Sequence, residues 1–567
     1  MGKFSRYKLF FPLIVLLLSP GVVRATILDF NVDPSYDYQG RSEITAFLYQ
    51  IGEHAYFFVE DNYYDGLSAE NKNVFSDSVK VLSEEFNNVI YPRLTSLYGT
   101  EWKPGADRDE RITILLSKIK TNSGGYFNSG DEYPKAQVSN SNEREMIYFN
   151  VEYVSDSLAK SYLAHEFMHL ITFNQKERLQ GVAEDTWLNE GRAEVAGTIL
   201  GYDDVYNNSA LQKRVKTFSQ NPGDSLTEWR SDIADYGVLN IFMQYFIDHY
   251  GTKVLADSLH SSTVGIPSIN EALKKNGYSE DFAQIFANWT IAVLINDCSV
   301  GQKYCFLNNN LKNLKVLPQL TYLPITGEST LTVTDYTKNW TGNWIKFIGG
   351  DGTLQMEFIG DERVSFSVPY ILRDSVGNYS VGFFDLSNSK RGNIYINNFG
   401  TKYESLVIVP SIHTKLSDFG EIENYYKFIW LASVVNGSSG SEEELIGQLL
   451  VQIEYLKAEI AKVQAQIEAI LGTGGVSVSC QSFETDLYFG MIGDAKVKCL
   501  QNFLKSQGTD IYPEGIVNGN FYSLTMQAVI RFQEKYAEQI LKPLGLDKGT
   551  GYFGQKTRQI ANSFLLK

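Results

Sequence analysis

Apolar residues follow two different spacings in the first half of the chain. Between residues 27 and 111, short strand-like apolar runs surround one stretch, 69–97, in which apolar residues recur every three or four positions, as on one face of a helix. Residues 111–120 (RITILLSKIK) and 145–152 (EMIYFNVE) have the composition of strands. From 157 to about 296 the helical spacing dominates. Strands followed by helices predict an α+β fold with two lobes.

The second half of the chain changes composition twice. Residues 319–435 consist of short alternating runs rich in Tyr, Phe, Thr, Val and Ile, separated by Gly, Asn and Asp, which predicts an antiparallel β-sandwich. Residues 441–471 place apolar residues at heptad spacing, with isoleucine at 446, 453, 460 and 467. This pattern predicts a coiled coil, and its β-branched residues favour a parallel homodimer. The alternative for this segment is a single amphipathic helix that lies on another domain.

Residues 480–567 form a final unit that contains an internal echo. Gly519-Asn520-Phe521 followed by Thr525, and Gly551-Tyr552-Phe553 followed by Thr557, share the same spacing. Each pattern predicts a turn that leads into a helix with Thr near its start. By themselves these residues indicate only helix capping and packing.

The N-terminus has the pattern of a signal peptide. Lys3, Arg6 and Lys8 precede an apolar run at 9–18, and Val23-Arg24-Ala25 has small or apolar residues at the positions that a signal peptidase reads, which predicts cleavage after Ala25 and removal of 1–25. The alternative is an uncleaved membrane anchor, but the run is short, Pro12 interrupts it and Pro20 follows it. We therefore expect a secreted protein, extracellular or periplasmic.

Composition narrows the class of protein. Apolar residues make up 43% and charged residues 20% of the chain, as in soluble globular proteins. The formal net charge of -16 argues against nucleic acid as a partner, because binding to phosphates needs a basic surface.

The four cysteines form two local pairs, Cys298 with Cys305 and Cys480 with Cys499, and in an exported chain they predict two disulfides. A zinc site made of all four is the weaker alternative, because no C-x-x-C spacing is present.

One helical segment has the spacing of a metal site. His165 and His169 are four residues apart, so on a helix both imidazoles lie on the same face and reach a single cation. Glu166 adjoins the first histidine, where its carboxylate can take a proton from a metal-bound water without binding the metal. The alternative is a pair of histidines on an ordinary helix.

A catalytic zinc ion needs a third protein ligand. Glu190 and Glu194 lie four apart in the segment WLNEGRAEVAG, so on a second helix one would bind the metal and the other would contact a ligating imidazole. We assign Glu190 to the metal and Glu194 to a hydrogen bond with His165. Glu177 and Glu184 are rival third ligands.

HEFMH followed by WLNEGRAE resembles the gluzincin zinc metallopeptidases, and the match to the hyicolysin-type neutral metallopeptidases is the nearest. The resemblance implies a thermolysin-like zincin fold over 26–318, with a mixed lobe to about residue 155 and a helical lobe after it. It also implies an endopeptidase in which Zn²⁺ activates water and Glu166 is the general base. Tyr236 would donate a hydrogen bond to the oxyanion, with His249 and His260 as the rival donors.

Residues 480–567 resemble three-helix peptidoglycan-binding domains. The matching residues are those of the internal echo together with the segment from Gly490 to Gln501 and the segments around Ala528-Val529 and Phe532-Gln533. The resemblance implies a tether to the cell wall, so the expected partners are a protein or peptide substrate and peptidoglycan. The alternative functions are a non-catalytic wall-associated binding protein on a zincin scaffold, an aminopeptidase, or a peptidoglycan peptide hydrolase.

Overall fold

The computed structural model describes residues 26–120, 123–323, 329–420, 422–435, 482–491 and 493–565. The described residues form two compact units, one up to residue 435 and one from residue 482. The predicted signal peptide, the predicted coiled coil at 441–471 and Cys480 lie outside the described residues. The structure confirms a multidomain chain built from helices and mixed sheets.

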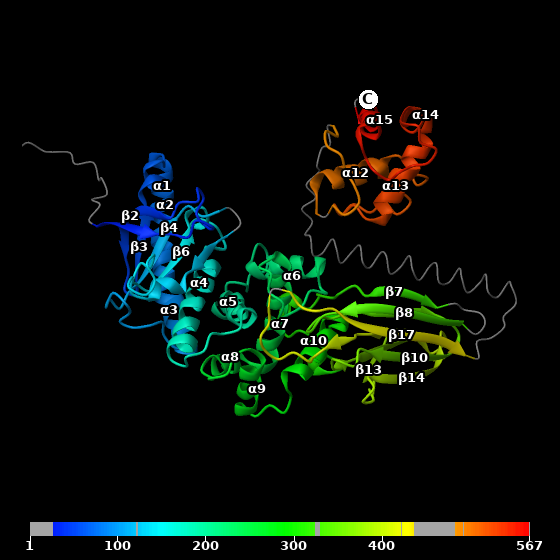
Figure 1. The fold of residues 1–567 in the computed structure, drawn as a ribbon, viewed down its shortest axis with the longest axis horizontal. Helices are drawn as coiled ribbons and strands as arrows, with labels where there is room; N and C mark the ends of the chain where they lie inside the picture. The colour runs from blue at the N-terminus through cyan, green and yellow to red at the C-terminus, as the bar shows by residue number, and fades with distance from the viewer. Residues whose placement is uncertain are drawn as a thin grey trace, which may run out of the picture. The chain divides into compact units, whose positions relative to one another are not determined.

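A six-stranded mixed sheet forms the first lobe (Figure 1). Its spatial order is β1-β2-β3-β4-β6-β5, in which β3, β4 and β6 are parallel and the others pair antiparallel. The strands are β1 (Ile27–Asn31), β2 (Glu43–Ile51), β3 (Ala55–Glu60), β4 (Ile112–Ser117), β5 (Gly125–Phe127) and β6 (Met146–Asn150). The strands predicted at 111–120 and 145–152 are therefore confirmed, as β4 and β6.

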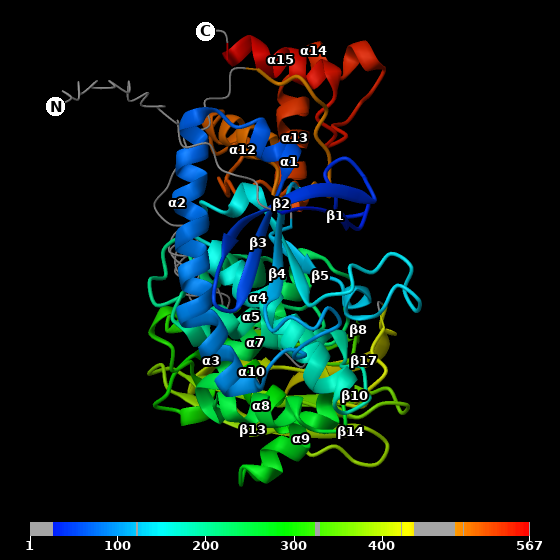
Figure 2. The same ribbon diagram turned by 90° about the vertical axis from the view of Figure 1, so that its left-hand side faces the viewer.

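Alternation along the central strands buries both faces of this sheet. Ile114 and Ile147 belong to the large core shared with the helices, whereas Leu115 and Tyr148 belong to a smaller core on the opposite face. The helical stretch predicted at 69–97 (Figure 2) contributes to the large core. It consists of α2 (Ala69–Glu85), a π-helical turn (Phe86–Ile90) and α3 (Tyr91–Tyr98), and the short α1 (Asp61–Asp65) precedes it.

Helices dominate the second lobe, as the apolar spacing predicts. They are α4 (Ala159–Thr172), α5 (Thr186–Leu200), α6 (Ala210–Gln220), α7 (Ile233–Tyr250), α8 (Thr252–Leu259), α9 (Gly265–Lys275) and α10 (Phe282–Ile295). A π-helical segment, Phe173–Arg178, continues α4. In the part of the chain that the structure describes, no helix is long and apolar enough to cross a membrane.

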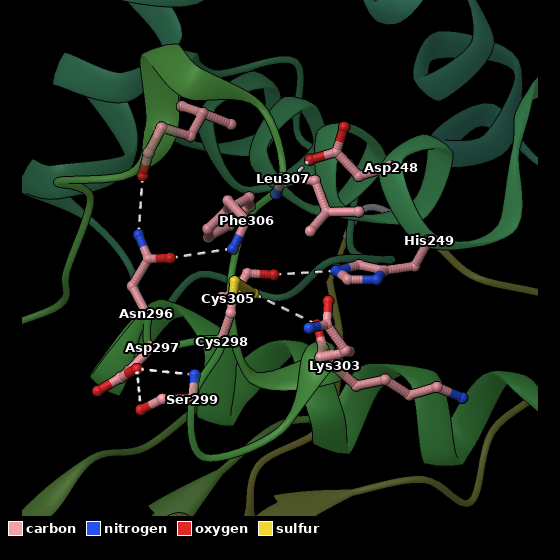
Figure 3. The surroundings of a disulfide bond; sticks show 12 residues. Asp248, His249, Asn296, Asp297, Cys298, Ser299, Lys303, Cys305, Phe306 and Leu307 are labelled. Carbon is pink, nitrogen blue, oxygen red and sulfur yellow. Dashed lines mark hydrogen bonds between the residues drawn. A yellow bond between two sulfur atoms is a disulfide. The ribbon is translucent and has the colours of Figure 1, made fainter.

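A disulfide closes the turn that follows α10. Cys298 and Cys305 are bonded (Figure 3), as predicted from their spacing. Cys499 is also disulfide-bonded, and its predicted partner lies outside the described residues.

The strand-rich region after residue 318 forms one nearly closed, mainly antiparallel sheet. One arm has the order β13-β12-β15-β9-β7, the other β14-β10-β17-β8, and the single pair Phe399–Tyr403 connects them. Both arms contribute to one core, in which Phe347 of one packs edge-on against Trp430 of the other with centroids 4.8 Å apart. The strands are β7 (Gln319–Leu323), β8 (Ser329–Thr337), β9 (Ile345–Gly349), β10 (Gly352–Gly360), β12 (Pro369–Asp374), β13 (Tyr379–Phe383), β14 (Arg391–Phe399), β15 (Tyr403–Ile408) and β17 (Tyr426–Val435), with a separate pair β11 (Phe366–Ser367) and β16 (Ser411–Ile412).

The helical and strand-rich regions share a core. Trp340 and Trp344, in the connection between β8 and β9, are buried with α10, where Trp340 lies 5.5 Å from Phe286 between ring centroids. The indole nitrogen of Trp344 donates to the carbonyl of Thr290 at 2.8 Å. Residue 319 therefore marks a change from helices to strands and not a break in packing.

The second unit contains α12 (Ala495–Ser506), α13 (Ser523–Lys535), α14 (Ala537–Ile540) and α15 (Gln555–Leu565). Gln501 of α12 is buried and satisfies the turn before α13. Its side-chain oxygen accepts from the backbone nitrogens of Asn518 and Gly519, both at 2.8 Å. Its amide donates to the carbonyl of Asn520 and to the hydroxyl of Thr525, both at 3.0 Å.

The same network occurs a second time on α13. The side-chain oxygen of Gln533 accepts from the backbone nitrogens of Thr550 at 2.8 Å and Gly551 at 3.0 Å. Its amide donates to the carbonyl of Tyr552 at 2.8 Å and to the hydroxyl of Thr557 at 3.0 Å. The echo seen in the sequence is therefore one turn-and-helix arrangement used twice, each held by a buried glutamine.

We predict that Gln533→Ala destabilises the second unit by at least about 2 kcal/mol, because several buried polar groups lose their partner at once. Thermal or urea unfolding of the chain would show this as an earlier transition of that unit. Asn502→Ala, at an exposed position of α12, is the control and should leave the transition unchanged. Equal stability of both variants would contradict the role of the glutamine.

Candidate metal centre

Two packed helices supply the residues of the predicted metal site. His165, Glu166 and His169 lie on α4, and Glu190 lies on α5, which packs directly against α4. The helices approach closely where Gly197 of α5 faces α4, since a Cβ added there would lie 3.2 Å from the hydroxyl of Ser161. The helix predicted for the WLNEGRAE segment is confirmed as α5.

The three predicted ligands converge. Nε2 of His165 lies 3.1 Å from Nε2 of His169, and the carboxylate oxygens of Glu190 lie 3.4 Å from the first nitrogen and 3.7 Å from the second. Three donors bound at 2.0–2.2 Å to one tetrahedral ion would be about 3.3–3.6 Å apart. The observed separations of 3.1–3.7 Å lie on either side of this range, so the two nitrogens and the carboxylate could hold a zinc ion after small adjustments.

Burial sets the charges of this group. Burial opposes ionisation of Glu190, but the nearby His169 and His165 imidazoles hold its pKa below the usual range. Burial lowers the pKa of His169. For His165 burial acts in the same direction, but the hydrogen bond to Glu190 and the neighbouring carboxylates outweigh it and raise the pKa to about 9. Oε2 of Glu190 is buried and, apart from its contact with His165, accepts no hydrogen bond from the described residues, which suits a carboxylate that binds a cation.

The ring nitrogens that face away from the site also have partners. Nδ1 of His169 lies 3.1 Å from the side-chain oxygen of Asn189. Nδ1 of His165 lies 3.6 Å from Glu194, so the two groups predicted to form a hydrogen bond are neighbours at slightly more than hydrogen-bond distance. Arg214 of α6 donates to both oxygens of Glu194 at 2.7 and 2.6 Å, and Asn240 of α7 donates to one at 3.1 Å. Such contacts orient imidazoles toward a metal.

Glu166 lies against the edge of the sheet. A Cβ added at Gly125 of β5 would lie 2.8 Å from Cγ of Glu166 and 2.5 Å from the carbonyl oxygen of Tyr148. Burial, the largest influence, raises the pKa of Glu166 to about 7. A carboxylate with such a pKa can both take up and release a proton near neutral pH.

Tyr236 at the start of α7 lies near the same group. Its ring lies 4.6 Å from the guanidinium of Arg214. Burial, followed by the charges of Glu190 and Glu194, raises its pKa well above the usual range, so the phenol keeps its proton and can donate a hydrogen bond.

The two rival histidines have other partners. Nε2 of His249 contacts the carbonyl of Cys305 at 2.9 Å (Figure 3), beside the disulfide. Nε2 of His260 contacts the carbonyl of Tyr98 at 2.9 Å. The rival acids are likewise outside the cluster of possible ligands: Glu184 is paired with Arg192 at 2.7 Å and Glu177 is exposed.

Sequence reasoning missed several residues of the site. Asn189 adjoins Glu190 in the same segment, so the helix itself could have indicated it. Arg214 and Asn240 carry no such signal, because they come from helices that only the fold brings near. Tyr36 is a further case: burial and the charges of Glu166 and Glu190 raise its pKa, which places its phenol near both acids.

We predict that Gly125→Ala destabilises the first unit by about 1–3 kcal/mol, because the methyl group must displace Glu166 or the neighbouring backbone. Urea unfolding would measure the loss. Gly420→Ala is the matched control, since a Cβ there meets no atom within 4 Å. Equal stability of the two variants would show that the close approach of β5 to α4 tolerates a side chain.

No protein-family model matches the chain, and no curated protein matches it. Among solved structures, the pre-peptidase C-terminal domain of a collagenase from Bacillus anthracis is 7% identical, covers 20% of this chain and 96% of its own, and has a TM-score of 0.14. A periplasmic inhibitor of g-type lysozyme from Aeromonas hydrophila is 8% identical over 21% and 98%, with a TM-score of 0.13. A family GH115 4-O-methyl-α-glucuronidase is 7% identical over 59% and 53%, with a TM-score of 0.12. At such TM-scores none of these likenesses indicates a shared fold.

Proposed function

We propose that this protein is a secreted zinc-dependent endopeptidase of the gluzincin type. The observation that supports it most directly is the convergence of His165, His169 and Glu190 at 3.1–3.7 Å. We further propose a zincin fold for 26–318 and, for 319–435, a β-sandwich whose two layers are the two arms of the nearly closed sheet. The remaining elements of this proposal are the coiled coil at 441–471 and a three-helix peptidoglycan-binding unit at 480–567.

The residues around the ligands have the chemistry that peptide hydrolysis needs. A zinc ion held there would act as a Lewis acid and lower the pKa of a coordinated water. Glu166 would take the proton of the attacking water and pass it to the leaving amine. Tyr236 would donate a hydrogen bond to the oxyanion, since its phenol stays protonated. Glu194, held by Arg214, would orient His165.

The edge of the sheet favours an endopeptidase over an aminopeptidase. Among the described strands β5 pairs only with β6, so one side of β5 is available to an extended peptide. The same strand contacts Glu166 through Gly125. A peptide bound as an extra strand would therefore continue past the site on both its N-terminal and its C-terminal side, as cleavage within a chain requires.

Zinc content and hydrolysis test the catalytic proposal together. We expect the purified chain to bind one zinc ion and to cleave an unfolded, N-terminally blocked protein until a chelator is added. Glu166→Gln should keep the metal and lose about 10²–10⁴-fold in kcat, because it removes only the proton acceptor. Glu190→Gln and His169→Ala should lose metal as well as activity.

Glu177→Gln is the control, since Glu177 is an exposed acid on the continuation of α4. Activity that survives both chelation and Glu166→Gln would refute the mechanism. Zinc binding without hydrolysis of any peptide would favour the non-catalytic binding protein. Cleavage of purified peptidoglycan but not of unfolded protein would identify a peptidoglycan peptide hydrolase instead.

Exposed aromatic rings support the proposed tether to the cell wall. Tyr488, Phe489, Tyr522 and Tyr552 are all large, exposed side chains of the second unit. Tyr488 and Tyr552 are stacked with centroids 6.2 Å apart, and Phe489 lies 6.1 Å from Tyr522. Exposed aromatic groups of this kind offer apolar faces to a ligand.

We predict that full-length protein co-sediments with purified peptidoglycan and that the double substitution Tyr488→Ala and Phe489→Ala weakens this binding about tenfold or more. Tyr395→Ala is the control, because Tyr395 is equally exposed but lies on β14. If the full chain does not co-sediment, or if the double variant binds as well as the control, the aromatic surface is not the attachment site.

A further inference from the structure

Three aspartates gather where the loop after α6 meets the start of α7. One carboxylate oxygen each from Asp224, Asp232 and Asp235 lies within 4.8 Å of the other two. Asp232 is the N-cap residue of α7, and Asp235 lies in its first turn. Capping explains part of this arrangement, because both residues accept hydrogen bonds from backbone nitrogens.

Two oxygens of the cluster are left over. Asp235 is only 3% exposed. Its Oδ2 accepts hydrogen bonds from the backbone nitrogens of Arg230 and Asp232, both at 2.9 Å. Its Oδ1 is buried without a hydrogen-bond partner. Oδ2 of Asp224 is also buried without a partner. The two carboxyl groups are within hydrogen-bonding reach of each other. Asp224 and Asp235 are therefore neighbours, and each has one buried oxygen that accepts no hydrogen bond from a donor group.

Within the described part of the chain, no lysine or arginine forms an ion pair with Asp224 or Asp235. Arg230 donates to Oδ2 of Asp232 at 2.8 Å, and its side chain is 51% exposed. Burial, followed by the charge of Asp235, raises the pKa of Asp224 to about 7. Adjacent buried carboxylates need either a shared proton or a cation.

We propose that Asp224, Asp232 and Asp235 bind a calcium ion. Oxygens bound to one ion at 2.3–2.6 Å lie at most about 4.6–5.2 Å apart, and the three carboxylate oxygens all lie within 4.8 Å of one another. Carboxylate oxygens suit a hard cation better than zinc. A pocket of about 550 Å³ beside the cluster, lined by Asp224, Arg230 and Asp232 among others, has room for the waters that complete six to eight ligands.

The ion would join the loop before α7 to the helix itself. This loop includes Trp229, whose ring packs edge-on against Tyr236 with centroids 4.9 Å apart. Calcium would therefore fix both the first turn of α7 and the ring that supports Tyr236. This second effect, unlike the binding itself, rests on the proposed function, because it matters only if Tyr236 acts in hydrolysis.

Calorimetric titration of the zinc-loaded full chain with calcium chloride tests the site. We expect one saturable calcium ion per chain and a rise of several degrees in Tm at saturation, because a ligand that binds only the folded state stabilises it. Asp224→Asn should abolish both effects and still fold, since its amide can donate to the unpaired oxygen of Asp235. Asp29→Asn is the control, because Asp29 is an exposed aspartate far in sequence from the cluster. This variant should bind calcium as the unaltered protein does.

Absence of saturable binding to the unaltered protein would overturn the proposal and leave the shared proton as the explanation. Equal calcium binding by Asp224→Asn would also overturn it. Zinc content and peptide hydrolysis, measured with and without calcium, separate this result from the proposed function. Calcium binding in a protein that hydrolyses no peptide would leave the calcium site standing while the endopeptidase assignment fails.

Discussion

Close contact between α4 and α5 is the constraint on which the candidate metal centre depends. The two imidazoles project from α4 and the carboxylate of Glu190 from α5, so their meeting requires the helices to approach closely. Gly197 permits this where it faces Ser161, at a separation that leaves little room for a larger side chain. A displacement of about 0.5 Å or more would be enough to spoil a metal site.

The charges of the side chains between these helices determine what the site can bind. Glu166, Glu190 and Glu194 are brought together in a largely buried region, and Arg214 binds only the last of them. The carboxylate of Glu190 lies between the two imidazoles, where its negative charge favours a cation.

Helix α7 connects several features of the molecule. It contributes Asn240 to the contacts of Glu194 and Tyr236 to the surroundings of the ligands, and it begins at the acidic cluster of Asp224, Asp232 and Asp235. Its far end contributes His249 to the turn closed by the disulfide. The position of this one helix is therefore tied to the candidate metal centre, to the acidic cluster and to the turn closed by the disulfide.

Local patterns in the sequence determined the helix at 69–97, the strands at 111–120 and 145–152, the helix of WLNEGRAE and the pairing of Cys298 with Cys305. They did so because periodicity, capping and short-range cysteine spacing depend on neighbours along the chain. The spacing of His165 and His169 likewise fixed a common helix face. The signal peptide and the coiled coil remain predictions from sequence. Only the tertiary structure decided that Arg214, Asn240 and Tyr36 belong near the ligands and that helices and strands share one core, because these contacts join residues far apart in the chain and no local periodicity encodes them.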